Sequence, residues 1–293
     1  MTRRDHLVRA TALDGLVLAY AIDATAVVGE LTRRHQTIPV TTAALGRLST
    51  GALLFGAMLK GDDHMVTIRM HGDGPAGLLL ASANARGGVR ALVANPQPDI
   101  DQVRDGKLFV SGAVGTSGFL TVTKDLGMGQ PYVGTTEIVS GEVGEDLAHY
   151  LARSEQIPSA VGIGVFVQAD GSVEAAGGYL VQLLPGVTDA EAERIETAIR
   201  DLPHPTTMLL SGEAPRRILE RIFGDDFRVL DERDVRFECA CSHERAALAI
   251  RMLGKDAVAG MIEEGAERGG AEVFCEFCRE RYLIGVAELR DML

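Results

Sequence analysis

All four cysteines of this 293-residue chain lie between residue 239 and the C-terminus, where they form two close pairs. One residue separates Cys239 from Cys241, and two residues separate Cys275 from Cys278. Four thiolates that converge from two short loops make a tetrahedral site for zinc. The spacing therefore predicts a small C-terminal domain that folds around one Zn²⁺ ion held by Cys239, Cys241, Cys275 and Cys278.

Four sulfur ligands at about 2.3 Å complete the zinc shell and leave no position for a water or a substrate, so hydrolysis by the metal is not expected. His243 lies near Cys241 in the sequence, but the shell is already full, and we expect this histidine at an exposed helix position. Two interpretations of the cysteines remain open. The first is a purely structural zinc, the commoner case, and the second, which we favour, is a switch that works through oxidation of the sulfurs.

Magnitudes indicate what loss of the ion would do. A unit of about 60 residues seldom gains more than roughly 3–5 kcal/mol from its own core. Structural zinc in small fingers contributes on the order of 10–16 kcal/mol. We therefore expect oxidation of the sulfurs to unfold the C-terminal domain.

Charge and hydropathy exclude several classes of protein. The net charge of −12 argues against a chain whose main task is to hold a phosphate backbone, so no nucleic-acid partner is expected. The longest apolar stretch, Gly51 to Leu59, is too short to span a bilayer, and a charged N-terminus without a signal-peptide core predicts the cytoplasm. The chain also lacks a G-x4-G-K-[ST] motif, and nothing indicates that it uses ATP.

Residues 1–184 are expected to form an α+β core domain with antiparallel sheets. Asp-Gly dipeptides at 14–15, 73–74, 105–106 and 170–171 are typical of tight turns, and short connections favour antiparallel pairing. Strands are predicted at 9–12, 16–22, 66–70, 119–123, 132–139, 161–167 and 179–184. Helices are predicted from Asp23 to His35, from Thr41 to Lys60 and from Glu145 to Glu155.

Residues 185–231 are expected to form a helical linker. Thr188 to Glu191 is a capping box that starts one amphipathic helix, and a second runs from about Glu213 to Phe223. Either this segment is packed permanently on its neighbour, the usual case, or it is metastable and exposes its apolar faces on demand. For the second case the client-binding residues would be Ile195, Ile199, Leu202, Ile218, Leu219, Ile222 and Phe223.

Residues 232–293 are expected to form the zinc domain. Ser242 is placed to cap a helix that runs to Leu253, and a second helix is predicted from Asp256 toward Glu264. Val273 and Phe274 lead into the Cys275–Cys278 turn, a strand follows at 281–284, and a short helix at 286–293 ends the domain.

Several short motifs, in this order along almost the whole chain, resemble the redox-regulated heat-shock chaperone family often called the 33 kDa chaperonin. They lie at 72–75, 153–158, 175–178 with 182–185, 237–242 and 275–278. The pairing of C-x-C with C-x2-C behind an Ala-Ala-Gly-Gly segment is highly specific.

The resemblance implies a chaperone core, a metastable linker and a zinc domain, and a holdase that works without ATP or enzymatic turnover. It implies that the reduced, zinc-bound form is inactive, and that oxidation releases zinc and unfolds the linker. It further implies the disulfides Cys239–Cys241 and Cys275–Cys278, unfolded proteins as partners, and a homodimer on activation.

Two other functions are compatible with cysteine pairs. A zinc-ribbon module that binds nucleic acid would have the same pattern, but the acidic balance and the lack of a basic face with aromatics count against it. A thiol–disulfide oxidoreductase would use Cys275 and Cys278, but such enzymes place this pair at the start of a helix, and here residues 279–284 read as a strand.

Overall fold

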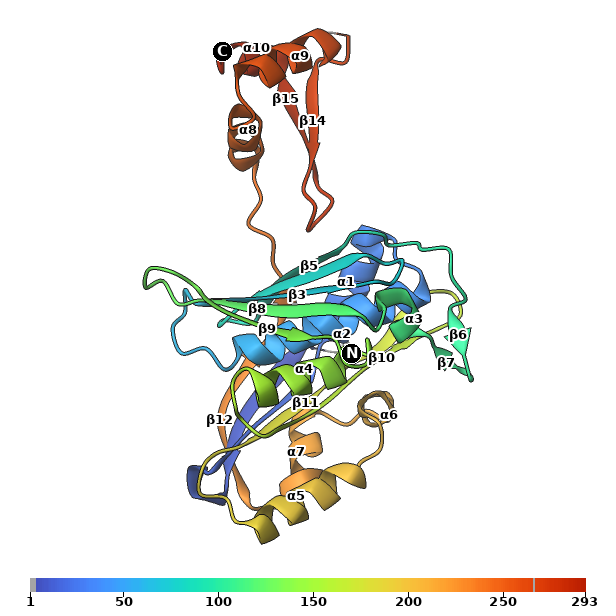
Figure 1. Ribbon diagram of the computed structural model, residues 1–293, viewed down its shortest axis with the longest axis vertical. Coiled ribbons are helices and arrows are strands. Elements are labelled where there is room, and N and C mark those ends of the chain that lie inside the picture. Colours follow the sequence, from blue (N-terminus) through green and yellow to red (C-terminus); the bar gives the residue numbers. More distant parts are fainter. Residues whose placement is uncertain (1–3, 266) are drawn as a thin grey trace. The chain divides into compact units, whose positions relative to one another are not determined.

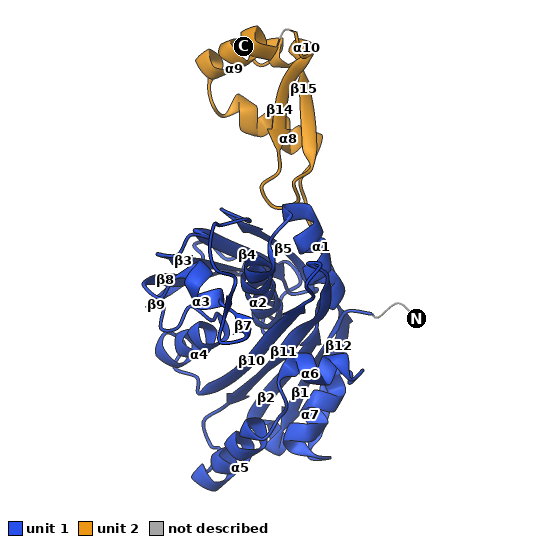
Figure 2. Cartoon of the chain, turned by 90° about the vertical axis from the view of Figure 1, so that its right-hand side faces the viewer, with its two compact units in different colours: residues 1–238 blue, residues 239–293 orange. Residues whose placement is uncertain are grey.

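The computed structural model describes residues 4–265 and 267–293. The chain divides into two compact units, residues 1–238 and residues 239–293 (Figure 2). Among the described residues, no helix combines the length and the apolar character needed to cross a membrane.

Unit 1 contains a five-stranded antiparallel sheet in the order β10-β11-β2-β1-β12. Its strands are β1 (His6–Ala12), β2 (Val17–Asp23), β10 (Ser159–Val167), β11 (Val173–Leu183) and β12 (Phe227–Asp234). The hairpin predicted around Asp14-Gly15 is confirmed, but its connection is a short 3-10 turn, η1 (Leu13–Gly15), rather than a two-residue turn. Leu13 and Asp14 both adopt positive φ angles there, at 49° and 51°.

The Ala-Ala-Gly-Gly segment lies inside β11, where neighbouring strands approach closely. A Cβ at Gly177 would come within 2.2 Å of the Ile22 carbonyl oxygen, and one at Gly178 within 2.0 Å of the Gly162 carbonyl oxygen. Because no side chain fits at these distances, only glycine permits this spacing of β10, β11 and β2.

The second sheet of unit 1 has six strands in the order β13-β5-β4-β3-β8-β9. They are β3 (Met65–Gly72), β4 (Leu78–Asn84), β5 (Gly88–Val93), β8 (Gly118–Asp125), β9 (Tyr132–Glu137) and the two-residue β13 (Arg236–Phe237), which is parallel to β5. A small hairpin, β6 (Val103–Arg104) with β7 (Lys107–Leu108), turns at Asp105-Gly106 as predicted. The sequence patterns had not indicated β4, β5 or β12.

Helices α1 (Thr25–His35), α2 (Pro39–Gly56), α3 (Val110–Val114) and α4 (Gly144–Arg153) contribute to the main core of unit 1 (Figure 1). The α2 helix packs on strands of both sheets, and the stretch from Gly51 to Leu59 is buried apart from half-buried Met58. The predicted helices at 23–35, 41–60 and 145–155 are thus present with shifted ends. The predicted α+β class with antiparallel sheets is confirmed.

The other face of the five-stranded sheet is covered by α5 (Asp189–Arg200), α6 (Pro205–Leu210) and α7 (Pro215–Phe223). Alternate residues of β1, β2 and β11 point to opposite cores, so that Leu7 and Tyr20 face the main core while Val8 and Ala19 face these helices. The capping box predicted at Thr188 is present, because the Thr188 and Glu191 side chains hydrogen-bond each other's backbone amides. Residues 189–234 thus belong to the same compact unit as residues 1–184, and β12 runs across position 231.

Unit 2 contains α8 (His243–Arg251), α9 (Lys255–Gly265), the antiparallel pair β14 (Gly270–Phe274) and β15 (Arg281–Gly285), and α10 (Val286–Arg290). The Ser242 hydroxyl accepts a hydrogen bond from the Arg245 amide, which caps α8 as predicted. Among the described residues, its core holds six buried apolar side chains, namely Ala246, Ala247, Ile250, Val258, Ile284 and Leu289. A core this small predicts little stability from apolar burial alone.

Candidate metal centre

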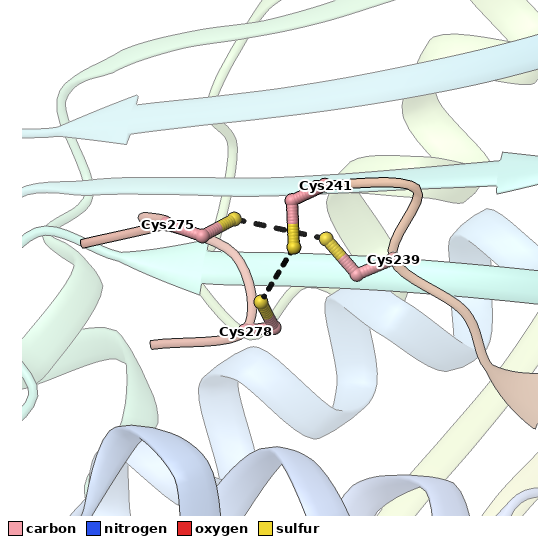
Figure 3. A group of neighbouring side chains, drawn as sticks. All are labelled: Cys239, Cys241, Cys275 and Cys278. Carbon is pink, nitrogen blue, oxygen red and sulfur yellow. Dashed lines mark hydrogen bonds between the residues drawn. The ribbon is translucent and has the colours of Figure 1, made fainter. Parts of the chain in front are cut away.

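The four cysteines reach a common point from two segments of unit 2. Cys239 and Cys241 lie on the extended chain before α8, and Cys275 and Cys278 lie on the turn between β14 and β15 (Figure 3). That turn is tight, because the Cys275 amide donates to the Glu280 carbonyl oxygen at 2.9 Å and the Arg279 amide donates to the Cys275 carbonyl oxygen at 2.8 Å. Arg279 adopts a positive φ of 59° after the second cysteine, and the sulfurs of Cys275 and Cys278 point toward those of Cys239 and Cys241 (Figure 3).

The four sulfurs have the spacing of a tetrahedral thiolate site. All Sγ atoms lie within 4.8 Å of one another, with Cys239 3.7 Å from Cys275 and Cys241 3.2 Å from Cys278. Zn–S bonds of about 2.3 Å in a tetrahedron place the sulfurs about 3.8 Å apart. Three of the cysteines are half-buried and Cys278 is buried, as expected of a closed structural site. The donor set therefore fits one Zn²⁺ ion with no open position.

Hydrogen bonds and burial give the four thiols different acidities. Burial raises the pKa of Cys241, but hydrogen bonds from Tyr282 and from neighbouring thiols together lower it by more than burial raises it. The pKa of Cys241 therefore lies below its ordinary value. Burial raises the pKa of Cys239 and of Cys278. Since several thiolates at this spacing repel one another, a cation is needed to hold all four ionised, and binding a metal must release protons.

Tyr282 is a site residue that the sequence analysis did not find. It lies on β15, and its hydroxyl donates a hydrogen bond to Cys241 Sγ at 3.0 Å. This hydrogen bond raises the pKa of the Tyr282 hydroxyl. Its position four residues after Cys278, on a predicted strand, carries no motif that would have indicated the contact.

His243 lies outside the sulfur cluster. It is the first residue of α8, and its Nε2 atom lies 2.9 Å from Glu288 Oε2. The chain after Cys278 continues into β15 and not into a helix, so the Cys275–Cys278 pair lacks the helix N-terminus that lowers a thiol pKa in thiol–disulfide oxidoreductases.

The residues expected to bind clients lie in unit 1, away from solvent. Ile195, Ile218, Leu219, Ile222 and Phe223 are buried, and Ile199 and Leu202 are partly buried against the same cluster. Their partners are residues of the five-stranded sheet, among them Val8, Ala19 and Val181. In this form of the protein the apolar faces of α5 and α7 are therefore covered.

Comparison with known proteins agrees with the cysteine geometry. A model of the family described as "Hsp33 protein" matches residues 5–285. The chain belongs to the Hsp33 family. The "33 kDa chaperonin" of Bacillus subtilis is 47% identical to it over 288 residues, with 98% of each chain covered. The protein of the same name from Listeria monocytogenes is 46% identical over 291 residues, again with 98% of each covered.

The fold agrees as well. The crystal structure of the 33 kDa chaperonin from Thermotoga maritima superposes with a TM-score of 0.90 at 35% sequence identity, and it covers 99% of this chain and 98% of the other. The resemblance drawn from the sequence motifs is thereby confirmed. Membership of the Hsp33 family supports a heat-shock chaperone, and its relatives are named chaperonins rather than enzymes.

Proposed function

We propose that the protein is a redox-regulated, ATP-independent holdase that binds unfolding proteins during oxidative stress. The reduced form binds one Zn²⁺ through Cys239, Cys241, Cys275 and Cys278 and is inactive. Oxidation forms the disulfides Cys239–Cys241 and Cys275–Cys278, releases the ion and activates the chaperone. The observation that carries this proposal is the convergence of four sulfurs within 4.8 Å in a unit with a very small core.

Energetics support the zinc ion as the trigger. The six buried side chains of the apolar core cluster of unit 2 supply no more than the roughly 3–5 kcal/mol expected of a core this size. Bound zinc adds on the order of 10–16 kcal/mol, so its loss exceeds the stability that the unit has without it. Release of the ion therefore unfolds residues 239–293.

The proposed disulfides join cysteines that are neighbours in the sequence, whereas the folded cluster also brings sulfurs of different pairs into contact. In the folded cluster, Sγ–Sγ contacts run between the pairs, at 3.7 Å from Cys239 to Cys275 and at 3.2 Å from Cys241 to Cys278. Once the unit unfolds, those long loops open, whereas the partners within C-x-C and C-x2-C stay close because the closing loops are short. Disulfides within each motif are therefore expected if the unit unfolds while the cysteines are being oxidised.

Client binding is assigned to the apolar faces of α5 and α7. These helices have 12 and 9 residues, a length at which an isolated helix is marginal in water and depends on packing. Strand β12 follows α7, and the two-residue β13, paired with β5, joins β12 to the cysteine segment, so loss of order after residue 238 leaves this short strand to hold the end of β12. Release of α5–α7 would expose Ile195, Ile199, Leu202, Ile218, Leu219, Ile222 and Phe223 to exposed core residues of clients.

The proposal includes the reducing cytoplasm as the compartment and a homodimer as the activated form. In such a compartment thiols stay reduced or bind metal, which keeps the chaperone in its zinc-loaded state until an oxidant appears.

Light scattering from a thermally unfolding client tests the redox control. We expect the peroxide-treated protein to suppress aggregation at a near-stoichiometric ratio and the reduced, zinc-loaded protein to suppress it weakly. Zinc content and free thiols, measured on the same samples, relate activity to the state of the cluster. Equal suppression by both forms would contradict the proposal.

A further inference from the structure

Strand β9 forms an open edge of the six-stranded sheet. It pairs with β8 on one side, and on the other side the described residues offer its backbone no hydrogen-bond partner (Figure 1). Unpaired N–H and C=O groups along such an edge are a template for another extended chain.

The register identifies which groups point outward. Phe119 lies opposite Glu137, so Gly118 lies opposite Ile138. The Ile138 amide donates to the Gly118 carbonyl oxygen, which identifies Gly118 and Ile138 as a hydrogen-bonded pair. Because bonded and non-bonded pairs alternate in antiparallel strands, residues 132, 134 and 136 bond to β8. The pairing of β8 with β3 is consistent with this register. The Asp73 amide donates to the Ser117 carbonyl oxygen, so residues 119, 121 and 123 of β8 bond to β3, and the residues between them bond to β9. The free N–H and C=O groups of β9 therefore belong to Val133, Thr135 and Glu137.

The other long edge strands of unit 1 are protected. Five of the eight residues of β12 are charged, which discourages pairing with a further strand. Strand β10 is packed by three helices, α2, α4 and α6, whereas β9 contacts α4, which lies on the face of the sheet toward which Gly134 points. In contrast, β9 carries one charge, that of Glu137, and exposes apolar side chains next to the edge, with Tyr132 50% and Val133 58% exposed.

We propose that the β9 edge binds extended, uncharged segments of unfolded client proteins by adding them as a further strand. This inference rests on the proposed holdase function and adds a second binding element to it. A row of alternating backbone donors and acceptors is complementary to an extended backbone of any sequence, which suits a partner that has lost its fold. Val133 on one face of the sheet and Tyr132 on the other favour apolar or β-branched side chains in the added strand.

A second copy of this chain fits the edge less well. Pairing two β9 strands would engage six residues from each copy, whereas a standard stable interface uses about 20–30 residues a side. An unfolded client is not limited in this way, because one segment can pair with β9 while another contacts the apolar faces of α5 and α7, and linked weak sites reinforce each other. The edge alone then binds weakly in the reduced form, and oxidation supplies the second contact.

The substitution Thr135→Pro tests the edge in the full chain. Proline removes an N–H that points away from β8, so the sheet keeps its own hydrogen bonds, while an added strand loses a bond and meets the ring. Thr135→Ala is the matched control, because both variants lose the hydroxyl that lies 3.1 Å from the Thr121 hydroxyl, but alanine keeps the N–H. Equal zinc content and thermal midpoints verify that both variants fold.

The probe is a fluorescein-labelled ten-residue peptide of alternating Val and Thr, with its affinity for peroxide-treated protein measured by anisotropy. We expect Thr135→Pro to weaken binding about tenfold and Thr135→Ala to leave it within twofold of the wild type. A peptide that is N-methylated at every second residue loses the N–H groups on one side and provides a test that needs no variant. The unmodified protein should bind this peptide at least tenfold more weakly than the unmethylated peptide.

The outcomes separate this inference from the holdase function. If the unmodified protein suppresses client aggregation after oxidation but Thr135→Pro and Thr135→Ala bind the peptide equally well, the edge is not a client site. Loss of dimerisation in Thr135→Pro with unchanged peptide binding would assign the edge to a second copy and overturn the proposal. Failure of the oxidised wild type to suppress aggregation would refute the holdase function itself.

Discussion

Tyr282 shows how a single hydroxyl can influence the cysteine cluster. Its bond to Cys241 Sγ holds one sulfur in place and draws electron density from it. Partners of this kind around a metal site orient the ligands, and their removal typically costs about 10–100-fold in metal affinity. A thiolate with a hydrogen bond is also a weaker nucleophile toward peroxide.

We therefore expect Tyr282→Phe to lower zinc affinity about tenfold and to speed the release of zinc by peroxide. In that oxidation the Cys241 thiolate attacks one peroxide oxygen, the O–O bond breaks, hydroxide leaves, and a second thiolate then displaces hydroxide from the sulfenic acid to form a disulfide. A chromogenic chelator measures both quantities. Tyr132→Phe, at a half-exposed position in the other unit, is the control, and identical release from both variants would contradict a role for the Tyr282 hydroxyl.

At the scale of secondary structure elements, α7 determines whether the proposed client-binding faces stay covered. Leu219 is fully buried between α7 and the five-stranded sheet. Replacement of such a leucine by alanine costs about 2–5 kcal/mol because it removes apolar contacts and leaves a cavity.

We expect Leu219→Ala to loosen α7, so that the reduced, zinc-loaded protein suppresses aggregation without oxidation. Glu220→Ala on the same helix is a suitable control, since Glu220 pairs only with the exposed arginines Arg216 and Arg217 in the described contacts. Amide hydrogen exchange of residues 205–223 and light scattering measure the two effects. If the reduced Leu219→Ala protein suppresses aggregation no better than the reduced wild type, exposure of the apolar face of α7 is not what allows client binding.

The start of α6 should make this region sensitive to mild acid. His204 Nδ1 accepts a hydrogen bond from the Thr206 amide, and burial, with the positive charges of Arg47 and Lys107, lowers the pKa of His204. The unfolded chain, with a histidine pKa of about 6.5, then binds a proton more readily than the folded one. The stabilisation is complete above about pH 6.5 and is lost as the pH falls from there toward the folded pKa.

The urea midpoint of the wild type should consequently fall between pH 7.5 and pH 5.5 by more than that of His204→Asn. Asparagine can cap the helix in place of histidine but does not titrate in this range. Parallel pH profiles for the two proteins would show that His204 does not contribute to the acid sensitivity.

For the whole molecule, the two compact units should respond differently to loss of metal. Unit 1 has large cores on both faces of the five-stranded sheet, whereas the apolar core cluster of unit 2 holds six buried residues among those described. Removal of zinc by a chelator under reducing conditions should therefore unfold residues 239–293 and leave the strands of unit 1 protected.

Hydrogen exchange with mass spectrometry on the full chain measures this difference, and added zinc should restore protection in unit 2. If residues 239–293 remain as protected and as resistant to protease without the ion as with it, zinc is not what keeps unit 2 folded. The proposed trigger would then be absent.

Local signals in the chain were sufficient to predict that the four cysteines gather at one place, and to predict most helices. The two cysteine pairs predict a set of four sulfurs that could hold a metal ion, and the structure places these sulfurs within 4.8 Å of one another, because the motifs are short and each constrains its own turn. Capping residues such as Thr188 and Ser242 mark helix starts for the same reason, since their hydrogen bonds reach only a few residues along the chain. The motifs that resemble the Hsp33 family extended these signals to the whole chain.

Only the tertiary structure decided which strands pair and what each surface faces. Strand β12 joins β1 from the far end of unit 1, and β4 and β5 were missed because their patterns alone do not separate strand from other apolar segments. The contact of Tyr282 with Cys241, the burial of α7 and the open edge of β9 depend on register and on distant partners. Such features arise from packing between segments far apart in the chain, which a local pattern cannot encode.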